Sequence, residues 1–540
     1  MTNTAEGMNR RGFLKAAGVM AAAAGIATTV SACGSDDKSD GNTSGSGSGS
    51  GGAMSKDEIT AGISYELGTN GYDPMTTTSA LTIAANWHTL EGLYEITPTP
   101  DRTVYAALAD GDPKVSEDGK SAEVTLRDGA VFHNGEPVTT EDVVFSFERV
   151  LDESNNSLYA SFIPFIEKVE AKDATTVMFT MKYPFTLVKE RLSVVKIVPK
   201  ASVEADSAAF DANPVGTGPW KMTDNGAASS QVVFTKFEDY TGPKPAKAAK
   251  MTWKILPDAA TRTNAMESKS VMAIDSVPYL SLTQVQASSS VESVQGFGLL
   301  FIMFNNGENS AMKDLKNRRG VLYAIDIDKV IQTGMANQAS PAKSFVQENH
   351  AAYKEASMVY SLDAAKATEH FAETGLKSVR MLVTNHDWVK GCTPIIKESL
   401  EAAGISVEFT ELKSSDLYTQ IASDDTWDIV IAPGDPSVFG ADADLLMRWW
   451  YAGDTWTDGR MHWKGTDSYN KVQELLEKAS QSSGDEQMDL WHQTFDLLSE
   501  EVPLYPLFHR KSPSAWNDDA LDGFEPISLT GLSFVDVGLK

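Results

Sequence analysis

The sequence predicts an α/β protein that is too long to fold around a single hydrophobic core. The chain has 540 residues, and chains longer than about 250 to 300 residues usually divide into several domains. Residues 121–152 read as an alternating strand, a turn and a capped helix. Residues 393–409 read as a helix, a glycine stop and a second alternating strand. Strands and helices that alternate in this way along a chain are typical of α/β folds.

The first 33 residues are predicted to be an export signal. Arg10 and Arg11 precede an apolar, alanine-rich run at 16–30, which is short for a membrane-spanning helix and is followed by small residues. The paired arginines resemble a twin-arginine signal. The string VSAC that ends at Cys33 resembles a lipobox, in which the cysteine thiol receives diacylglycerol. We therefore expect Cys33 to be lipidated and to anchor the chain at the outer face of the cell membrane.

Residues 34–56 are predicted to be a flexible tether between this anchor and a folded body. Up to Gly52 the segment is rich in glycine, serine and aspartate and has no apolar residue to bury. The chain has two cysteines, and the second is Cys392. Once Cys33 is acylated, no intrachain disulfide can form, so the body must be stabilised by its hydrophobic cores.

The composition is that of a globular protein with a strongly acidic surface. Hydrophobic residues make up 42% of the chain and charged residues 22%. The formal net charge of −28 argues against nucleic acid or an anionic bilayer as a direct partner. Solubility alone is sufficient to explain this charge.

A strand, a tight turn and a helix are predicted in close succession near the start of the folded body. Apolar and polar residues alternate from Ala122 to Leu126, as in a half-buried strand. Asn134 and Gly135 are a strong hairpin signal because both tolerate a positive φ. Thr139 can cap the following helix, and Asp142 occupies the third helical position, where it can complete a capping box.

The same part of the chain resembles a known family. The string LADGDPKVSEDGKSAEVTLRDGAVFHNGEPVTTEDVVFSFERV at 108–150 resembles the signature of the dipeptide- and oligopeptide-type solute-binding proteins of ABC importers, solute-binding protein family 5. Further similar strings are NPVGTGPWK at 213–221 and RRGVLYAID at 318–326. The resemblance spans nearly the whole chain after the tether.

This resemblance implies an α/β fold of the two-lobed periplasmic-binding-protein type, with an additional subdomain in the first lobe and the ligand cleft between the lobes. We expect the first lobe at 57–302 with its subdomain at about 93–213, the second lobe at 303–508, and a return to the first lobe at 509–540.

The implied function is capture of a peptide or another small polar solute outside the membrane and its delivery to ABC permease subunits, which must be other chains. We expect a monomer without a cofactor. An exported hydrolase with a noncontiguous active site, and a surface sensor or adhesin on the same fold, remain alternatives. No contiguous motif of a catalytic serine, a metal site or a phosphate-binding loop is present in the sequence, so we assign no catalytic residue and no metal ligand.

Candidate ligand-binding residues follow from the aromatic and polar groups that such a cleft needs. Aromatic density is highest at 449–451, where adjacent tryptophans cannot both face one core from one helix. One of them is therefore expected at a cleft or a partner, and a plain structural role remains the alternative. The expected ligand-binding residues are Tyr65, Asn385, His386, Trp388, Gly434, Asp435, Trp449, Trp450 and Tyr451.

The resemblance also indicates a departure from peptide binding in the usual mode. Ala432 stands where peptide-binding members carry an aspartate for the peptide amine, and Val383 and Asn385 stand where dipeptide-type members carry groups for the carboxylate. Burying a charged terminus without its partner costs on the order of several kcal/mol. A short zwitterionic peptide held by these positions is therefore not expected.

Overall fold

The computed structural model describes residues 57–68 and 71–540. The predicted export signal with Cys33 and the predicted tether at 34–56 lie outside the described residues. Within the described part, no helix combines the length and the apolar character that crossing a membrane requires.

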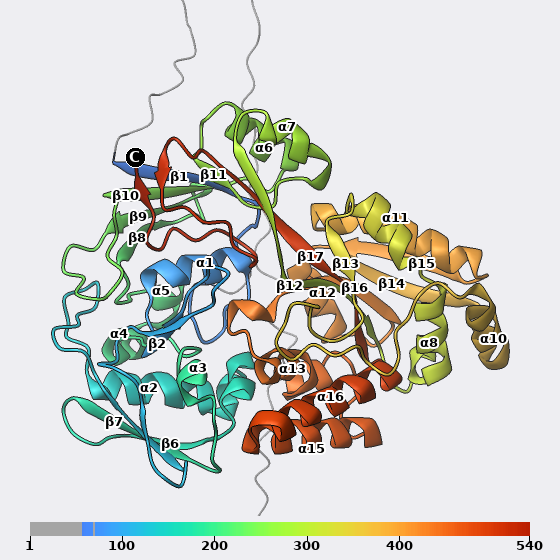
Figure 1. Cartoon of the computed structure of the whole chain (residues 1–540), viewed down its shortest axis with the longest axis horizontal. Helices are drawn as coiled ribbons and strands as arrows, with labels where there is room; N and C mark the ends of the chain where they lie inside the picture. Colours follow the sequence, from blue (N-terminus) through green and yellow to red (C-terminus); the bar gives the residue numbers. More distant parts are fainter. Residues whose placement is uncertain (1–56, 69–70) are drawn as a thin grey trace, which may run out of the picture. The chain divides into compact units, whose positions relative to one another are not determined.

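An 11-stranded mixed sheet joins two groups of strands (Figure 1). Its order is β15-β14-β16-β12-β17-β11-β1-β10-β9-β8, and β13 pairs with β17 beside this path. The first lobe, as we call it, is built on β1 (Glu58–Ile63), β8 (Trp220–Asn225), β9 (Gln231–Lys236), β10 (Lys250–Ile255) and β11 (Ala273–Ile274). The second lobe is built on β13 (Ala339–Pro341), β14 (Ser378–Thr384), β15 (Ser406–Leu412) and β16 (Ile429–Gly434).

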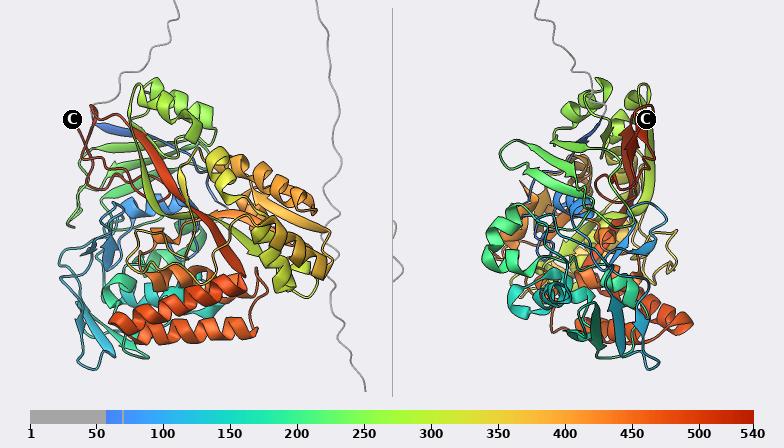
Figure 2. Two further views of the ribbon diagram at one scale, coloured as in Figure 1. Left: turned by 45° about the vertical axis from the view of Figure 1, so that its right-hand side comes forward. Right: turned by 90° about the vertical axis from the view of Figure 1, so that its left-hand side faces the viewer.

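Two long antiparallel strands run through both lobes, β12 (Ser290–Phe304) and β17 (Leu504–Trp516) (Figures 1 and 2). At one end they pair with each other beside β11, and at the other end β12 also pairs with β16. The register between them shifts between Gln295 and Leu299, where the chain passes from one lobe to the other. Because both strands are continuous across the lobes, the lobe boundaries expected from the sequence stay predictions.

The core of the first lobe follows from the alternation predicted at its first strand. Ile59, Ala61 and Ile63 of β1 are buried, as predicted. Trp253 of β10 packs against Phe234 on the neighbouring strand. The remaining elements of this layer are α1 (Ala80–Thr89), α6 (Ala259–Glu267), η3 (Tyr279–Ser281), α7 (Leu282–Gln286), β18 (Leu521–Asp522) and β19 (Gly538–Leu539).

A subdomain of the first lobe contains a second, four-stranded sheet in the order β4-β5-β7-β6. Its strands are β4 (Lys114–Val115), β5 (Ser121–Thr125), β6 (Ile166–Ala171) and β7 (Thr176–Met181), and the hairpin β2 (Tyr94–Ile96) and β3 (Val104–Ala106) precedes them. Its helices are α2 (Thr140–Leu151), η1 (Glu153–Asn155), η2 (Leu158–Phe162), α3 (Val188–Leu192), α4 (Lys200–Ala205) and α5 (Ser207–Ala212).

The capping box and the buried helix face predicted for this subdomain are confirmed, and the turn at 134–135 is confirmed in part. The side chain of Thr139 accepts a hydrogen bond from the backbone N–H of Asp142 at 3.3 Å, and the Asp142 carboxylate accepts one from the Thr139 N–H at 3.0 Å. Gly135 has a φ of +86° in the predicted turn, whereas Asn134 does not have a positive φ, so the turn is not one in which both residues are left-handed. Val143 and Phe147 form the buried face of α2.

Helices cover both faces of the second lobe's strands (Figure 2). The helices of the second lobe are η4 (Ala311–Lys313), α8 (Leu315–Ala324), α9 (Ile327–Lys329), η5 (Val330–Gly334), α10 (Ala364–Thr374), α11 (Asp387–Ala402), α12 (Ser414–Ile421), η6 (Pro436–Val438), α13 (Ala443–Tyr451), α14 (Asp454–Thr457), α15 (Asp467–Gln481) and α16 (Gly484–Glu501).

The predicted start of α11 at Thr393 and Pro394 is wrong. The helix begins at Asp387, directly after β14, and continues through Pro394. The Thr393 hydroxyl donates to the carbonyl oxygen of Val389 at 2.9 Å, so the helical turn is already formed before the proline. The predicted end is confirmed, because Gly404 follows the helix with a φ of +87°.

Candidate ligand-binding site

The point where β12 and β17 pass between the lobes carries a buried cation, Arg510 of β17. Its side chain donates a hydrogen bond from Nη2 to Oγ1 of Thr530 at 2.9 Å. The guanidinium carbon lies 5.2 Å from the ring centroid of Trp388. Burial disfavours the charged form, but the neighbouring Tyr65, Tyr279 and Asp435 outweigh this effect and raise the pKa of Arg510. Arg510 therefore stays charged at this position.

Asp435, which directly follows β16, faces the same point. Its Oδ2 accepts hydrogen bonds from the N–H and the hydroxyl of Thr530 at 3.2 and 3.3 Å, and its Oδ1 accepts one from the hydroxyl of Ser437. A Cβ atom at Gly298 of β12 would lie 3.4 Å from Nε of Arg510 and 3.5 Å from Oδ2 of Asp435. Glycine therefore leaves the edge between the cation and the carboxylate uncovered. Desolvation raises the pKa of Asp435, although Ser437 and the nearby arginines oppose this.

Aromatic groups from both lobes lie close to Arg510. Tyr65 follows β1 in the first lobe, and its ring centroid lies 5.8 Å from that of His386, which precedes α11 in the second lobe. Nδ1 of His386 and Nε1 of Trp388 are buried and have no hydrogen-bond partner among the described residues. Burial and the charge of Arg510 lower the pKa of His386 to about 4, so its imidazole is neutral at neutral pH.

The lobes touch each other around this cluster. Arg102, between β2 and β3, donates a hydrogen bond to the carbonyl oxygen of Ser437 on η6. At the rim, Lys413 and Glu66 form an ion pair at 3.6 Å. The structure is therefore a closed arrangement of the two lobes.

A small cavity lies between the lobes in this arrangement. A cavity of about 40 Å³ lies beside η6 and is lined from both lobes, by Asn86, Glu95, Tyr159, Lys196, Val438 and Phe439 among others. Pockets that hold small molecules usually have roughly 300 to 1,000 Å³. A larger cavity of about 490 Å³, beside the ion pair of Asp73 and Arg149, lies within the first lobe and contains none of the expected site residues. The cavity beside η6 is therefore too small to hold a solute of that size unless the lobes separate.

Of the residues expected at the site, the structure brings Tyr65, His386, Trp388 and Asp435 together. Gly434 lies just behind them, where a Cβ would be 2.5 Å from Cζ2 of Trp450. The backbone N–H of Asn385 donates to the carbonyl oxygen of Leu412 at 2.9 Å, which ties this residue to β15.

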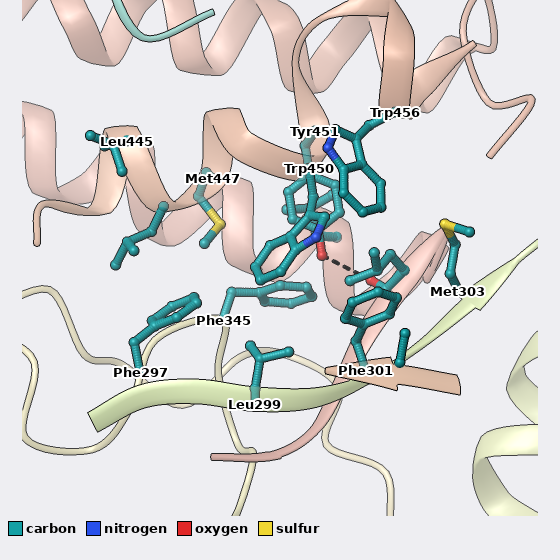
Figure 3. Packing of buried hydrophobic residues seen from close by; sticks show 14 of the residues in the cluster. Phe297, Leu299, Phe301, Met303, Phe345, Leu445, Met447, Trp450, Tyr451 and Trp456 are labelled. Atoms are coloured by element: carbon teal, nitrogen blue, oxygen red, sulfur yellow. Dashed lines mark hydrogen bonds between the residues drawn. The ribbon is translucent and has the colours of Figure 1, made fainter. Parts of the chain in front are cut away.

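The aromatic residues of α13 occupy a different place from the one expected for ligand contact. Trp450 is 2% exposed and packs on Phe297 and Phe301 of β12 (Figure 3). The hydroxyl of Tyr451 donates to the carbonyl oxygen of Leu504 at 2.9 Å inside the core. Trp449 is half-buried and stacks on Phe162 of the subdomain. Trp450 and Tyr451 thus belong to the hydrophobic core of the second lobe, and Trp449 to the contact between the lobes.

Sequence reasoning missed Arg510, Arg102 and Thr530. A signal for Arg510 was present, because a charged residue directly follows His509 at the end of the apolar run at 502–508. A charged residue inside a buried strand is rare unless it has a specific partner. No comparable signal marks Thr530, which reaches the site from the C-terminal segment.

Within residues 57–68 and 71–540, no group of three or more histidine, cysteine, aspartate or glutamate side chains could hold a metal ion. Cys392 is buried on α11, and burial raises the pKa of its thiol to about 12. The groups that the structure brings together at this place are a cation, a carboxylate and aromatic rings.

Comparison with known proteins agrees with this geometry. Residues 103–468 match the family model of bacterial extracellular solute-binding proteins, family 5, middle region, and this match covers well over half of the chain. The chain belongs to this family. The family 5 resemblance at 108–150 and the predicted two-lobed α/β fold are thereby confirmed.

Individual relatives are more distant. The glutathione-binding protein GsiB of Escherichia coli (strain K12) is 24% identical over 437 residues, which cover 79% of this chain and 84% of the relative. The dipeptide-binding protein from Pseudoalteromonas sp. SM9913 in complex with Met-Leu has a TM-score of 0.78 at 20% identity, covering 89% of this chain and 100% of that chain. The binding protein AgaA of A. tumefaciens R10 in complex with agropinic acid has a TM-score of 0.79 at 23% identity, covering 89% and 99%.

As a family 5 protein, the chain is an extracytoplasmic substrate-binding component of an ABC importer, which takes up peptides or related solutes and works with membrane permeases. The family consists of solute-binding proteins rather than enzymes.

Proposed function

We propose that this family 5 protein captures its solute at the cluster of Tyr65, His386, Trp388, Asp435 and Arg510. The observation that supports the proposal is the origin of these side chains. Tyr65 comes from the first lobe, His386 and Trp388 from the second, and Arg510 from a strand that runs through both. A solute bound among them touches both lobes at once.

Such a solute stabilises the closed arrangement only through its greater affinity for that arrangement. The aromatic walls on either side supply apolar surface, and the arginine and the carboxylate fix orientation. The solute we propose is a peptide or another small polar molecule, in keeping with the relatives named for glutathione, Met-Leu and agropinic acid. Ala432 and Val383 are buried, uncharged residues of β16 and β14, so a peptide held by ion pairs at these two positions is not the proposed mode.

We further propose that the protein acts as a monomeric lipoprotein. Cys33 is the predicted attachment point, and the predicted tether at 34–56 leaves the folded body free to meet a permease. The twin-arginine pair Arg10 and Arg11 is the predicted export signal.

Mass spectrometry of natively purified protein tests this function. Protein purified without denaturation is expected to carry a solute in a one-to-one ratio, and denaturation is expected to release that solute chemically unchanged. Release of a cleaved product during incubation would instead favour the exported hydrolase, and the absence of any bound or bindable solute would favour a sensor or adhesin.

A further inference from the structure

Arg510 differs from the other buried arginines in how its charge is satisfied. Arg191 and Arg448 form ion pairs with aspartates, and Arg262 and Arg318 each donate to several backbone carbonyl oxygens. Arg510 donates to the neutral hydroxyl of Thr530 and also forms a hydrogen bond with Tyr279, and within the described part of the chain no carboxylate lies within 4.0 Å of its guanidinium.

The guanidinium of Arg510 has five N–H groups, which is more than its two hydroxyl partners, Thr530 and Tyr279, can accept. None of its nitrogens is among the buried polar atoms without a partner, whereas Nε of Arg191 and Nε of Arg102 are. On one side, Gly298 of β12 contributes no side chain that could cover the guanidinium. On another side, the ring of Trp388 lies 5.2 Å away. The guanidinium thus presents free donors at an edge that aromatic groups flank.

Asp435 does not accept hydrogen bonds from these N–H groups of Arg510. Its two oxygens already accept hydrogen bonds from Ser437 and from the N–H and hydroxyl of Thr530. Because Thr530 in turn accepts from Arg510, the carboxylate acts on the arginine through this threonine and holds it in place. A carboxylate group that pairs directly with the guanidinium of Arg510 must therefore come from outside the described part of the chain.

We propose that the solute of this protein carries a carboxylate group, which Arg510 binds between Trp388 and Tyr65. A planar carboxylate matches the fork of a guanidinium through two parallel hydrogen bonds, and aromatic rings favour flat groups beside them. A phosphate, with its higher negative charge, fits less well because Asp435 lies beside the same edge. This inference rests on the function proposed above and names the chemical class of the solute.

Arg510 also supplies a cationic partner for a carboxylate, which the sequence pattern lacked. In the resemblance to peptide-binding members, the carboxylate partners would lie at Val383 and Asn385 on β14 and just after it. The buried cation instead comes from β17, which lies beyond β16 and β12 in the sheet order. A carboxylate bound there occupies a different position from one bound at the end of β14.

The test is a thermal-shift panel of small carboxylic acids, each paired with its primary amide and including Met-Leu, N-acetyl-Met-Leu and Met-Leu amide. Acids are expected to raise the melting temperature and their amides to have little effect. Equal stabilisation by acids and amides would overturn the inference while leaving the function intact. If no compound in the panel stabilises the protein, and the purified protein also carries no solute, both the inference and the proposed function would be wrong.

Calorimetry on the best acid then tests the residue. Arg510→Gln is expected to weaken binding by about 30-fold or more, because it removes one partner of a buried, hydrogen-bonded charge pair. Arg460→Gln is the matched control, because Arg460 also stacks on a tryptophan, 4.1 Å from the ring of Trp456, but outside the cluster. Equal affinities of the wild type and Arg510→Gln would overturn the inference.

Asp435→Asn keeps the test decisive if Arg510→Gln folds poorly. This change removes a negative charge beside the proposed carboxylate but keeps an oxygen that can accept from Thr530. We expect the acid to bind several-fold more tightly to Asp435→Asn. Weaker binding would show that Asp435 pairs with a cationic group of the solute, and the proposal would be wrong.

Discussion

Arg191 and Asp442 form a bidentate ion pair across the two lobes. Nη1 and Nη2 of Arg191 each donate to one oxygen of Asp442, both at 2.5 Å, and Nη2 also reaches Asp444 at 3.0 Å. Arg191 belongs to α3 of the first-lobe subdomain and is 0% exposed, whereas Asp442 caps α13 of the second lobe. If the lobes separate to admit a solute, this pair must break.

We therefore predict that Asp442→Asn shifts the protein toward an open form. The asparagine can still cap α13 but leaves Asp444 as the remaining charge partner of Arg191, so the contact between the lobes is weakened. Small-angle scattering without solute should give a larger radius of gyration than for the wild type. Asp454→Asn, in an exposed pair with Lys464, is the control. An unchanged radius for Asp442→Asn would mean that other contacts hold the lobes together.

A second prediction concerns closure by the solute. A solute that contacts Tyr65 and Trp388 together should favour the closed arrangement, because it gains both contacts only there. Scattering at saturating concentration of a bound acid should give a smaller radius of gyration than the solute-free protein. Identical radii would instead indicate a rigid binding surface of the kind expected for an adhesin.

A third prediction concerns the membrane anchor. Cys33→Ala should release the protein from the membrane fraction, since one acylated thiol is the only hydrophobic attachment predicted from the sequence. The folded body should be unaffected, because the predicted tether separates Cys33 from it. Fractionation after a high-salt wash, with circular dichroism of the released protein, checks both statements. Recovery of the variant in the membrane fraction would contradict the prediction.

His88 of α1 gives a prediction for pH. Its Nδ1 donates to the carbonyl oxygen of Ala84 at 2.7 Å, and its Nε2 accepts from the N–H of Phe534 at 2.9 Å, so the ring must be neutral. Burial lowers its pKa to about 4, whereas an unfolded histidine has a pKa of about 6.5. The unfolded chain therefore binds the extra proton between these values, and this group lowers the free energy of unfolding by about 1.4 kcal/mol per pH unit as the pH falls through the window.

Denaturant titrations between pH 7 and pH 4 check this expectation. In His88→Gln the free energy of unfolding should depend less steeply on pH in that window, by about the same 1.4 kcal/mol per unit. Equal slopes for the two proteins would show that His88 titrates normally.

Gly320 in α8 gives a prediction in which sequence and structure disagree in sign. Replacing a helical glycine by alanine usually stabilises a protein by up to about 1 kcal/mol. A Cβ at Gly320, however, would lie 2.7 Å from Cε1 of Phe371 on α10. Overpacking of this kind costs about 1 to 3 kcal/mol, so Gly320→Ala should lower the free energy of unfolding. Adding Phe371→Leu should recover part of the lost free energy of unfolding. If Gly320→Ala alone is more stable than the wild type, the expected clash with Phe371 does not occur.

The sequence predicted features that depend on neighbouring residues better than features that depend on distant ones. The capping box of Thr139 and Asp142 involves residues three positions apart, so the string alone determines it. The role proposed for Arg510 depends on its contacts with Trp388 and Thr530, which are remote from it along the chain. The predicted start of α11 at Pro394 is wrong because proline is a frequent first residue of helices, whereas this helix begins earlier, directly after β14.

The aromatic residues of α13 illustrate the same limit. A row of large rings is equally suited to a core and to a binding surface, and only the placement of β12 beneath α13 decides between them. Trp450 supports the site from behind, through its contact with Gly434, without facing a solute.

Because β12 and β17 pair antiparallel, the segment that forms the second lobe begins and ends at neighbouring positions and can be exchanged as one unit. The chain leaves the first lobe along β12 and returns along β17, and Met303 and Leu504 are direct partners in the ladder. A chimaera spliced at these two positions would replace everything between them by the corresponding stretch of a relative. Tyr65 and Arg510 would stay with the recipient, while His386, Trp388 and Asp435 would come from the donor. Recombination between two family genes at these points could thus recombine halves of two recognition sites in a single event.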